Sequence, residues 1–405
     1  MLPNYRSLQW NHYAARAQMT TNVSDPELSS DGKPQIQLFE SALSEEYTCL
    51  SYTWGQENDG GGPFPILING KTFPIRRNLK IFLHIAMRKY PKQRIWIDAI
   101  CIDQGNNAEK SDQVSRMGEI YSLAVRVYAW LGEASRETDL VFAVLQQFRD
   151  RKREEACPTS FDAAEQLSIY QQLFRDIYQE EAGSLPDQCE WHDKTLHKEF
   201  NWLRPLYERC YWQRVWIVQE LVLAKTVIVH CGDKSIDFDD IYGLSPDWGS
   251  FEQEFDMTGY NTVKQHTKGW RTIRTIHGHR SRRKIVEWKM DGEALYSMNI
   301  KMSEKGDVAV LDEVIRIYAK HHECSCLKDK IYGFRELISR WKEELVVDYK
   351  KSDLEVFLDV ARLGLFDSKQ YGGQYIACCL WEAMKLGNSE DFSDCIRQHL
   401  PELDV

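Results

Sequence analysis

Four short apolar runs, separated by segments with helical spacing, constrain the fold of this 405-residue chain more than any other feature. Residues 77–90 and the segment after Asn106 or Asn107 place their apolar residues on one side of a helix. Strands that alternate with helices indicate the α/β class, a parallel sheet with helices on both faces. The strands are predicted at residues 47–52, 94–98, 125–131 and 226–230.

The length of the chain and a break in this rhythm predict more than one structural unit. Residues 136–200 are too many for an ordinary connection, so we predict an insertion with its own helices. Beyond about residue 245 the character changes and becomes mainly helical. We expect a first domain over residues 1–245, with its core in 47–135 and 201–232, and a mainly helical C-terminal region over residues 246–405.

Charge and cysteine usage narrow the class of protein. A formal charge of -10 argues against general nucleic-acid binding. Eleven cysteines without regular spacing favour reduced thiols over a disulfide framework. No 18-residue apolar run and no signal-peptide core is found, so we expect no membrane segment and a cytoplasmic location.

The tryptophan-rich stretch CYWQRVWIVQELVLA, residues 210–224, combines apolar side chains with a carboxylate. A helix predicted over residues 203–224 puts Trp212, Trp216, Gln219 and Glu220 on one side. A buried charge needs a partner or a cleft. Two interpretations therefore stay open: Glu220 pairs with Arg214 or another arginine, or it lies in a cleft framed by two indoles.

Polar and aromatic residues follow the first two predicted strands, where open α/β sheets bind ligands. Asp98 and Asp103 come near the exit of the second strand. They could hold a metal, act as acid and base, or form turns, and the turn role is the commoner one for Asp103. The residues at the first strand end are Ser51, Tyr52, Trp54 and Gly55.

A second cluster ends the helix predicted over residues 311–326, and its side chains are metal ligands in type. A closed zinc site usually uses two separated ligand pairs, and only one pair is evident, so no metal is expected. The residues are His321, His322, Cys324 and Cys326.

Three long blocks together resemble the fungal heterokaryon incompatibility (HET) domain over residues 47–232. They are YTCLSYTWG, RIWIDAICIDQGNNAEKSDQVSRMGEIYSLAVRVYAWLG and YWQRVWIVQELVLAKTVIVHCG. The later CSCLKDKIYGFREL and VVDYKKSDLEVF resemble a segment that often follows this domain. The family is associated with programmed cell death after fusion of genetically unlike fungal cells.

The HET family has also been proposed to be distantly similar to Toll/interleukin-receptor (TIR) domains, which implies a TIR-like (flavodoxin-like) sheet. Ser51-Tyr52 and Asp98 resemble TIR strand ends, and Trp216 to Glu220 resembles the TIR Trp-Cys-x-x-Glu pattern, with Ile217 in the cysteine position. The insertion at 136–200 replaces a short TIR loop. In enzymatic TIR domains the glutamate is required to cleave NAD between nicotinamide and ribose, so the resemblance implies that Glu220 is catalytic.

The favoured hypothesis is an NAD-consuming hydrolase or cyclase, with NAD or a related nucleotide as substrate and no resident cofactor. A carboxylate stabilises the oxocarbenium-like ribosyl cation, and Trp54 or Trp216 would stack on a ring of the substrate, with Gln219 nearby. One rival is a non-enzymatic signalling module that self-associates through the same helix and loop. Another is metal-dependent chemistry at Asp98 and Asp103. We expect a homo-oligomer in the active state.

Overall fold

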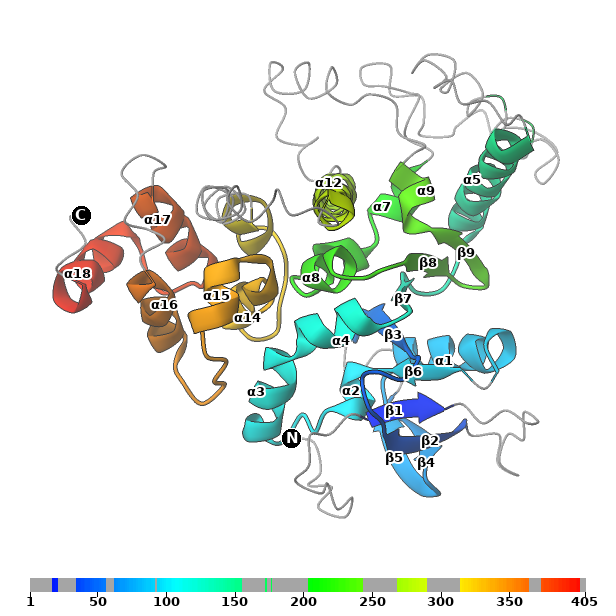
Figure 1. Ribbon diagram of the computed structural model, residues 1–405, viewed down its shortest axis with the longest axis horizontal. Helices are drawn as coiled ribbons and strands as arrows, with labels where there is room; N and C mark the ends of the chain where they lie inside the picture. Colours follow the sequence, from blue (N-terminus) through cyan, green and yellow to red (C-terminus); the bar gives the residue numbers. More distant parts are fainter. Residues whose placement is uncertain are drawn as a thin grey trace.

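The computed structural model describes residues 17–20, 34–55, 62–91, 93–154, 172, 176, 203–242, 268–289, 314–363 and 373–400. Within these residues the strands form one sheet that is flanked by helices (Figure 1). The order across the sheet is β5-β4-β2-β1-β6-β3-β7-β8-β9. The predicted α/β class is therefore confirmed.

Four parallel strands form the middle of the sheet, and each coincides with a predicted run. β3 lies between β6 and β7, and β8 pairs with the other side of β7. Numbered along the chain, these strands therefore lie in the order 2-1-3-4. Their bounds are Thr48–Tyr52 (β3), Arg94–Trp96 (β6), Arg126–Trp130 (β7) and Val227–Cys231 (β8).

The second strand ends earlier than predicted. β6 stops at Trp96 instead of residue 98, because Asp98 begins the short helix α2 (Asp98–Cys101). Oδ1 of Asp98 accepts a hydrogen bond of 2.7 Å from the backbone N–H of Ala99. A carboxylate suits the first turn of a helix, where backbone N–H groups lack helical partners.

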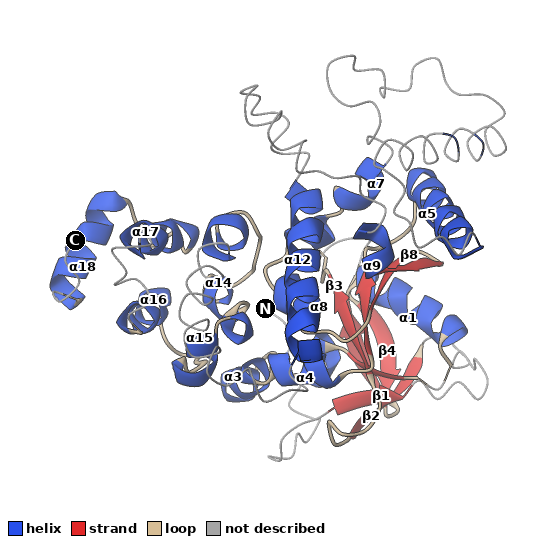
Figure 2. Cartoon of the chain, turned by 45° about the horizontal axis from the view of Figure 1, so that its top comes forward, coloured by secondary structure: helices blue, strands red, loops and turns tan. Residues whose placement is uncertain are grey.

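Helix α1 (Arg77–Lys89) covers one face of the sheet, as Figure 2 shows. Its apolar residues recur at helical spacing, so they form one buried stripe. This confirms the one-sided apolar pattern predicted over residues 77–90, and the buried residues are Leu79, Phe82, Leu83, Ala86 and Met87.

The opposite face carries α4 (Met117–Leu123) and α8 (Ile217–Val222), and α12 (Lys268–Lys289) packs over α8. α3 (Asn107–Ser115) precedes α4 and is capped by the Asn106 side chain, which accepts from the N–H groups of Ala108 and Glu109. Successive side chains of a strand point to opposite faces. Ser51 therefore faces α8, whereas Tyr52 packs in the α1 layer.

Apart from β3, the strands before α1 extend the sheet on one side. They are β1 (Ala17–Thr20), β2 (Gln35–Glu40), β4 (Phe64–Ile68) and β5 (Lys71–Ile75). Asn69 and Gly70 join β4 to β5 with φ angles of 49° and 77°, the left-handed pair that a type I′ hairpin needs. Asn69 also bonds Leu38 of β2 through both its amide atoms, at 2.8 and 2.9 Å. A hairpin at Asn69-Gly70 is what the sequence predicts.

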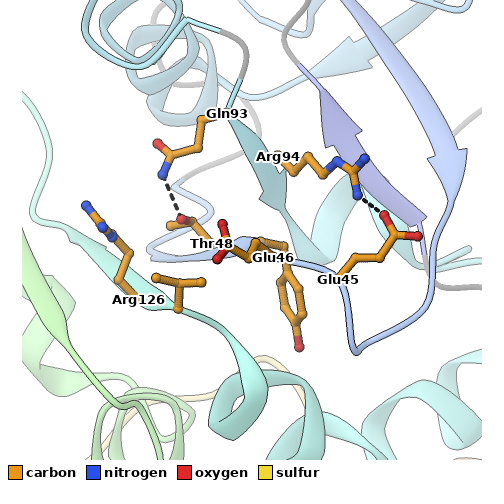
Figure 3. A pocket seen from close by; sticks show the side chains of 8 residues that line it. Glu45, Glu46, Thr48, Gln93, Arg94 and Arg126 are labelled. Carbon is orange, nitrogen blue, oxygen red and sulfur yellow. Dashed lines mark hydrogen bonds and ion pairs between the residues drawn. The ribbon is translucent and has the colours of Figure 1, made fainter.

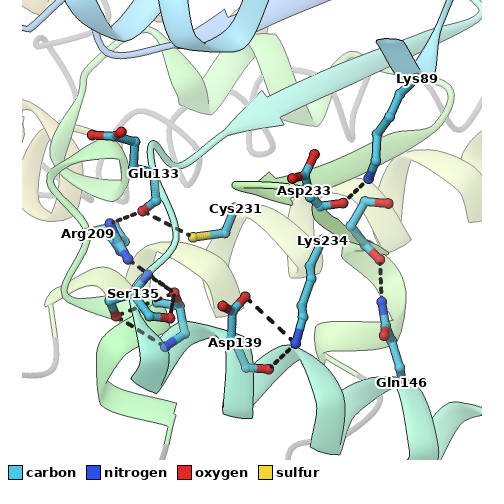
Figure 4. A network of polar contacts seen from close by, with 11 residues as sticks. Lys89, Glu133, Ser135, Asp139, Gln146, Arg209, Cys231, Asp233 and Lys234 are labelled. Atoms are coloured by element: carbon cyan, nitrogen blue, oxygen red, sulfur yellow. Dashed lines mark hydrogen bonds and ion pairs between the residues drawn. The ribbon is translucent and has the colours of Figure 1, made fainter. Parts of the chain in front are cut away.

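A polar network attaches α5 (Arg136–Glu154) to the far edge of the sheet (Figure 4). Lys234 Nζ donates to the carbonyl of Asp139 at 2.9 Å, and Gln146 Nε2 donates to the carbonyl of Ser235 at 3.1 Å. Both contacts link α5 to β9 (Lys234–Asp237), which leads into α9 (Phe238–Tyr242). The first helix of the predicted insertion thus packs on the sheet. The remainder of residues 155–200, apart from 172 and 176, lies outside the described residues.

The continuous helix predicted over residues 203–224 is wrong. The segment forms three pieces, α7 (Arg204–Tyr207), the 3-10 helix η4 (Cys210–Gln213) and α8. The break between η4 and α8 lies at Arg214, whose backbone is extended and forms a parallel bridge with Glu323. The N–H of Val215 donates to the carbonyl of Glu323 at 3.1 Å, a partner that a continuous helix could not offer.

The described C-terminal residues are mainly helical (Figure 1). Their buried side chains belong to the same large apolar cluster as those of the sheet. Tyr349 links the C-terminal region to α3. Its backbone N–H donates to Ser111 Oγ at 3.1 Å, and the centre of its ring lies 4.1 Å from Lys110 Nζ. The elements are η6 (Val314–Ala319), α14 (Asp329–Tyr332), η7 (Arg335–Leu337), α15 (Ser339–Glu344), α16 (Asp353–Arg362), α17 (Gly373–Ala383) and α18 (Ser389–His399).

Candidate functional site

Glu220 belongs to α8, and its side chain reaches Ser51 at the carboxyl end of β3. Its side chain is 2% exposed, and its Oε2 accepts a short hydrogen bond from Ser51 Oγ. The hydroxyl of Tyr211 lies 2.7 Å from Ser51 Oγ. Because the single hydroxyl proton of Ser51 is donated to Glu220, the proton between the two hydroxyls must come from Tyr211. The first strand end and the tryptophan-rich stretch therefore meet at one buried carboxylate.

Arg214 supplies the countercharge, as one of the two sequence interpretations proposed. Its Nη1 lies 3.6 Å from Glu220 Oε2, an ion pair that is longer than a hydrogen bond. This nitrogen is buried and has no hydrogen-bond partner among the described residues. Burial lowers the pKa of Arg214, but Glu220 and Asp98 raise it further, so the net shift is upward. The guanidinium thus stays charged and is shared by two carboxylates.

Both carboxyl groups are harder to ionise than usual. Burial raises the pKa of Glu220, and this outweighs the opposite effects of Arg214 and Ser51. Burial also raises the pKa of Asp98 against the effects of Arg214 and Trp54. A pair of carboxyl groups with raised pKa values beside one cation is typical of functional sites, and it also occurs in structural ion-pair networks.

Trp54 forms the outer part of this group of residues. Its Nε1 donates to Asp98 Oδ2 at 2.9 Å, and its ring is half-buried. The Arg76 guanidinium lies 5.6 Å from the centre of the Trp54 ring and donates to the Gly55 carbonyl at 2.7 Å. Gly55 has a φ of 79°, which glycine adopts without strain. We call Ser51, Trp54, Asp98, Arg214 and Glu220 the carboxylate cluster.

Three of the predicted site residues do not point into the carboxylate cluster. Tyr52 is buried on the opposite face of the sheet. Asp103 Oδ1 accepts from the N–H of Gly105 at 2.9 Å, the turn role that was considered commoner. The Trp216 ring lies near Gly333 and Asp329 in the C-terminal region.

The expected frame of two indoles is absent around Glu220 in the described structure. Trp212 lies in the core, where its Nε1 donates to the Leu206 carbonyl at 2.9 Å. Gln219 is 1% exposed, and neither its amide oxygen nor its amide nitrogen has a hydrogen-bond partner among the described residues. Sequence reasoning missed Tyr211 and Arg76, because their roles depend on contacts between segments that are distant in the chain.

The described cavity lies away from the carboxylate cluster. It has a volume of about 580 Å³ and is lined by residues 45–48, 93–94 and 125–126 (Figure 3). These residues precede or begin β3, β6 and β7, so the cavity is at the amino ends of the strands. The carboxylate cluster lies at the opposite, carboxyl ends.

No group of three or more metal-ligating side chains occurs among the described residues. His322 Nε2 lies 3.1 Å from Thr272 Oγ1, and its ring packs edge-on against Tyr318. The helix predicted to end in this cluster stops at Ala319. The nine cysteines that the structure describes are free thiols.

Comparison with known proteins agrees with the resemblance seen in the sequence. Residues 47–220 match the family of heterokaryon incompatibility proteins (HET). Over 206 residues the chain is 31% identical to heterokaryon incompatibility protein 6, OR allele, of Neurospora crassa. The matched part covers 47% of this chain and 29% of that relative. No solved structure matches. In the described part of the chain, no helix has the length and apolar character needed to cross a membrane.

Proposed function

We propose, from the premise that residues 47–220 form a heterokaryon incompatibility domain, that this chain is an effector of incompatibility and the associated cell death. We further propose that it acts by consuming NAD in the cytoplasm, where cysteines remain reduced. The carboxylate cluster would bind NAD or a related nucleotide and cleave the bond between nicotinamide and ribose.

The order of the middle strands supports a TIR-like fold. The order 2-1-3-4 is the order of the first strands in flavodoxin-like sheets, and such sheets bind ligands at the carboxyl ends of the strands. Trp54, Asp98 and Glu220 all belong to that end. A nucleotide site in that place therefore fits the general rule for open α/β sheets.

The observation that carries the proposal is the environment of Glu220. Its carboxylate is held by Ser51 and paired with Arg214 in surroundings that exclude water. A fixed negative charge in a water-poor site stabilises a developing ribosyl cation more strongly than a solvated one. Nicotinamide leaves as a neutral ring, so a single carboxylate suffices without an acid-base pair.

Substrate access requires a rearrangement, because Glu220 is 2% exposed. Moving Arg214 away from Glu220 would free the carboxylate for the ribose. A protein that is active only when assembled fits this requirement, and we propose that the active form is a homo-oligomer.

The proposal is tested by incubating the purified protein with NAD and measuring nicotinamide release by chromatography, at low and high protein concentration. Release should rise more than linearly with concentration. Glu220→Gln should lower the rate by about 100- to 1000-fold, the loss expected for one preorganised electrostatic group. Glu119→Gln removes an exposed carboxylate of α4 and should keep full activity. No release from the wild type at any concentration contradicts the proposal.

A second candidate is a non-enzymatic module that signals by self-association. The observation in its favour is that Glu220 has the partner expected of a structural ion pair, Arg214. In that case the wild type kills cells without consuming NAD. Measuring cellular NAD and cell death in the same culture separates the two candidates.

A further inference from the structure

The cavity at the amino ends of β3, β6 and β7 has the properties of a second binding site (Figure 3). Its volume of about 580 Å³ lies within the range of small-molecule pockets. It lies at the end of the sheet opposite to the carboxylate cluster, so the proposed NAD chemistry does not use it. Nothing in the HET-domain match assigns a role to it.

Part of the lining is held in place by its own bonds. Arg94 and Glu45 form an ion pair on one side of the cavity. Gln93 Nε2 donates to Thr48 Oγ1 at 2.9 Å, and Gln93 Oε1 accepts from the hydroxyl of Tyr128 at 2.8 Å. These contacts fix the shape of the wall before any ligand arrives, which lowers the entropic cost of binding.

Two charged side chains of the lining have no oppositely charged partner among the described residues. Arg126 lies near the neutral hydroxyl of Tyr128, and neither Arg126 nor Glu46 forms an ion pair with a described residue. Figure 3 shows both residues at the same cavity, with no contact between them. One available cation and one available anion therefore face the same space.

We propose that this cavity binds a small zwitterion of the amino-acid type. The ligand carboxylate would bind the forked donors of Arg126, and the ligand ammonium would bind Glu46. Val125, which is 38% exposed, would contact the carbon chain. Glu45 and Glu46 would repel a ligand with only a negative charge, and Arg94 and Arg126 would repel one with only a positive charge. The lining therefore favours a ligand that carries both charges.

Isothermal titration calorimetry with a series of amino acids of increasing charge separation tests the proposal. The probes are glycine, β-alanine, 4-aminobutyrate, 5-aminopentanoate and 6-aminohexanoate, with acetate and methylammonium as singly charged controls. We expect saturable binding that is strongest at one chain length, and at least tenfold weaker binding of both controls. Equal binding of acetate, or no saturable binding of any zwitterion, overturns the proposal.

Variants assign the binding to this cavity. Arg126→Gln and Glu46→Gln should each weaken binding of the best zwitterion by about 10- to 100-fold, the effect of losing a hydrogen bond to a charged group. The matched controls Arg88→Gln and Glu119→Gln change exposed charges elsewhere and should bind as the wild type does. Urea unfolding confirms that each variant is folded. Unchanged binding in both cavity variants contradicts the site.

Discussion

The buried pair of Glu220 and Arg214 predicts a measurable coupling between the two residues. Their charged atoms lie 3.6 Å apart, and the exposed fractions of the side chains are 2% and 16%. Coulomb's law at this distance, with an effective dielectric constant of about 20, gives an attraction of about 4–5 kcal/mol. Desolvation offsets part of this, so Glu220→Gln should lower the free energy of unfolding by about 3 kcal/mol.

Arg214→Met should be more damaging than Glu220→Gln. It removes the cation that serves both Glu220 and Asp98, and it leaves two carboxyl groups without a countercharge. We expect a loss of about 4–5 kcal/mol, the upper part of the range for breaking a buried pair. The double variant removes the charge that Arg214→Met leaves unpaired at Glu220. Its loss should therefore fall short of the sum of the single losses by about 2 kcal/mol.

Urea unfolding followed by tryptophan fluorescence measures these differences at the first transition of each variant. Ser51→Ala is the matched control, because it removes a hydrogen bond to Glu220 without changing a charge. Its cost should be about 1.5–3 kcal/mol. A coupling below about 0.5 kcal/mol between positions 214 and 220 would refute the reasoning, since independent sites are additive within that margin.

Three further predictions concern the fold. Gly269→Ala should destabilise by about 3 kcal/mol, because the added carbon would lie 1.7 Å from the Tyr207 carbonyl oxygen; a melt like that of the wild type contradicts this. Burial lowers the pKa of His230 from 6.5 to about 3, so its contribution to stability is present at pH 7 and is lost as the pH falls from 6.5 towards 3. His322 has a similarly lowered pKa and acts in the same direction, so the difference between two proteins is the test: in urea titrations between pH 7 and pH 5 the wild type should lose about 2 kcal/mol more stability than His230→Gln, and equal pH dependence refutes this. Ser352→Ala removes the capping box with Glu355 and should cost about 1 kcal/mol in the same assay; no change at all would mean that the cap is not formed in solution.

Local patterns were sufficient to predict the middle of the sheet and the helix that covers one face. The four central strands are continuous apolar runs, and such runs are buried on both faces of a parallel sheet. The hairpin at Asn69-Gly70 was predictable because the two residues tolerate the left-handed conformation that its turn requires. Adjacent residues of a strand point to opposite faces of the sheet. The prediction that Ser51 and Tyr52 belong to one site was therefore inconsistent with the strand predicted over the same residues.

Contacts between distant segments decided the arrangement of the outer strands and of the carboxylate cluster. β2 lies inside the sheet because it pairs with β1 on one side and with β4 on the other. The carboxylate cluster has the same origin, since Ser51, Asp98 and Arg214 come from three separate segments and meet only when the strands align.

The break at Arg214 shows most clearly what the sequence by itself could not determine. The stretch has helical spacing throughout, and its residues are ordinary helix formers. Helical propensity differs by less than about 1 kcal/mol per residue among such side chains, so a tertiary contact can override it. The bridge to Glu323 satisfies the backbone and brings the Arg214 guanidinium to Glu220. The sequence indicated that a carboxylate would lie in apolar surroundings, and left open whether an arginine or a cleft would accompany it. The tertiary structure decided that Arg214 would be its partner, because that pairing depends on a backbone contact from the C-terminal region.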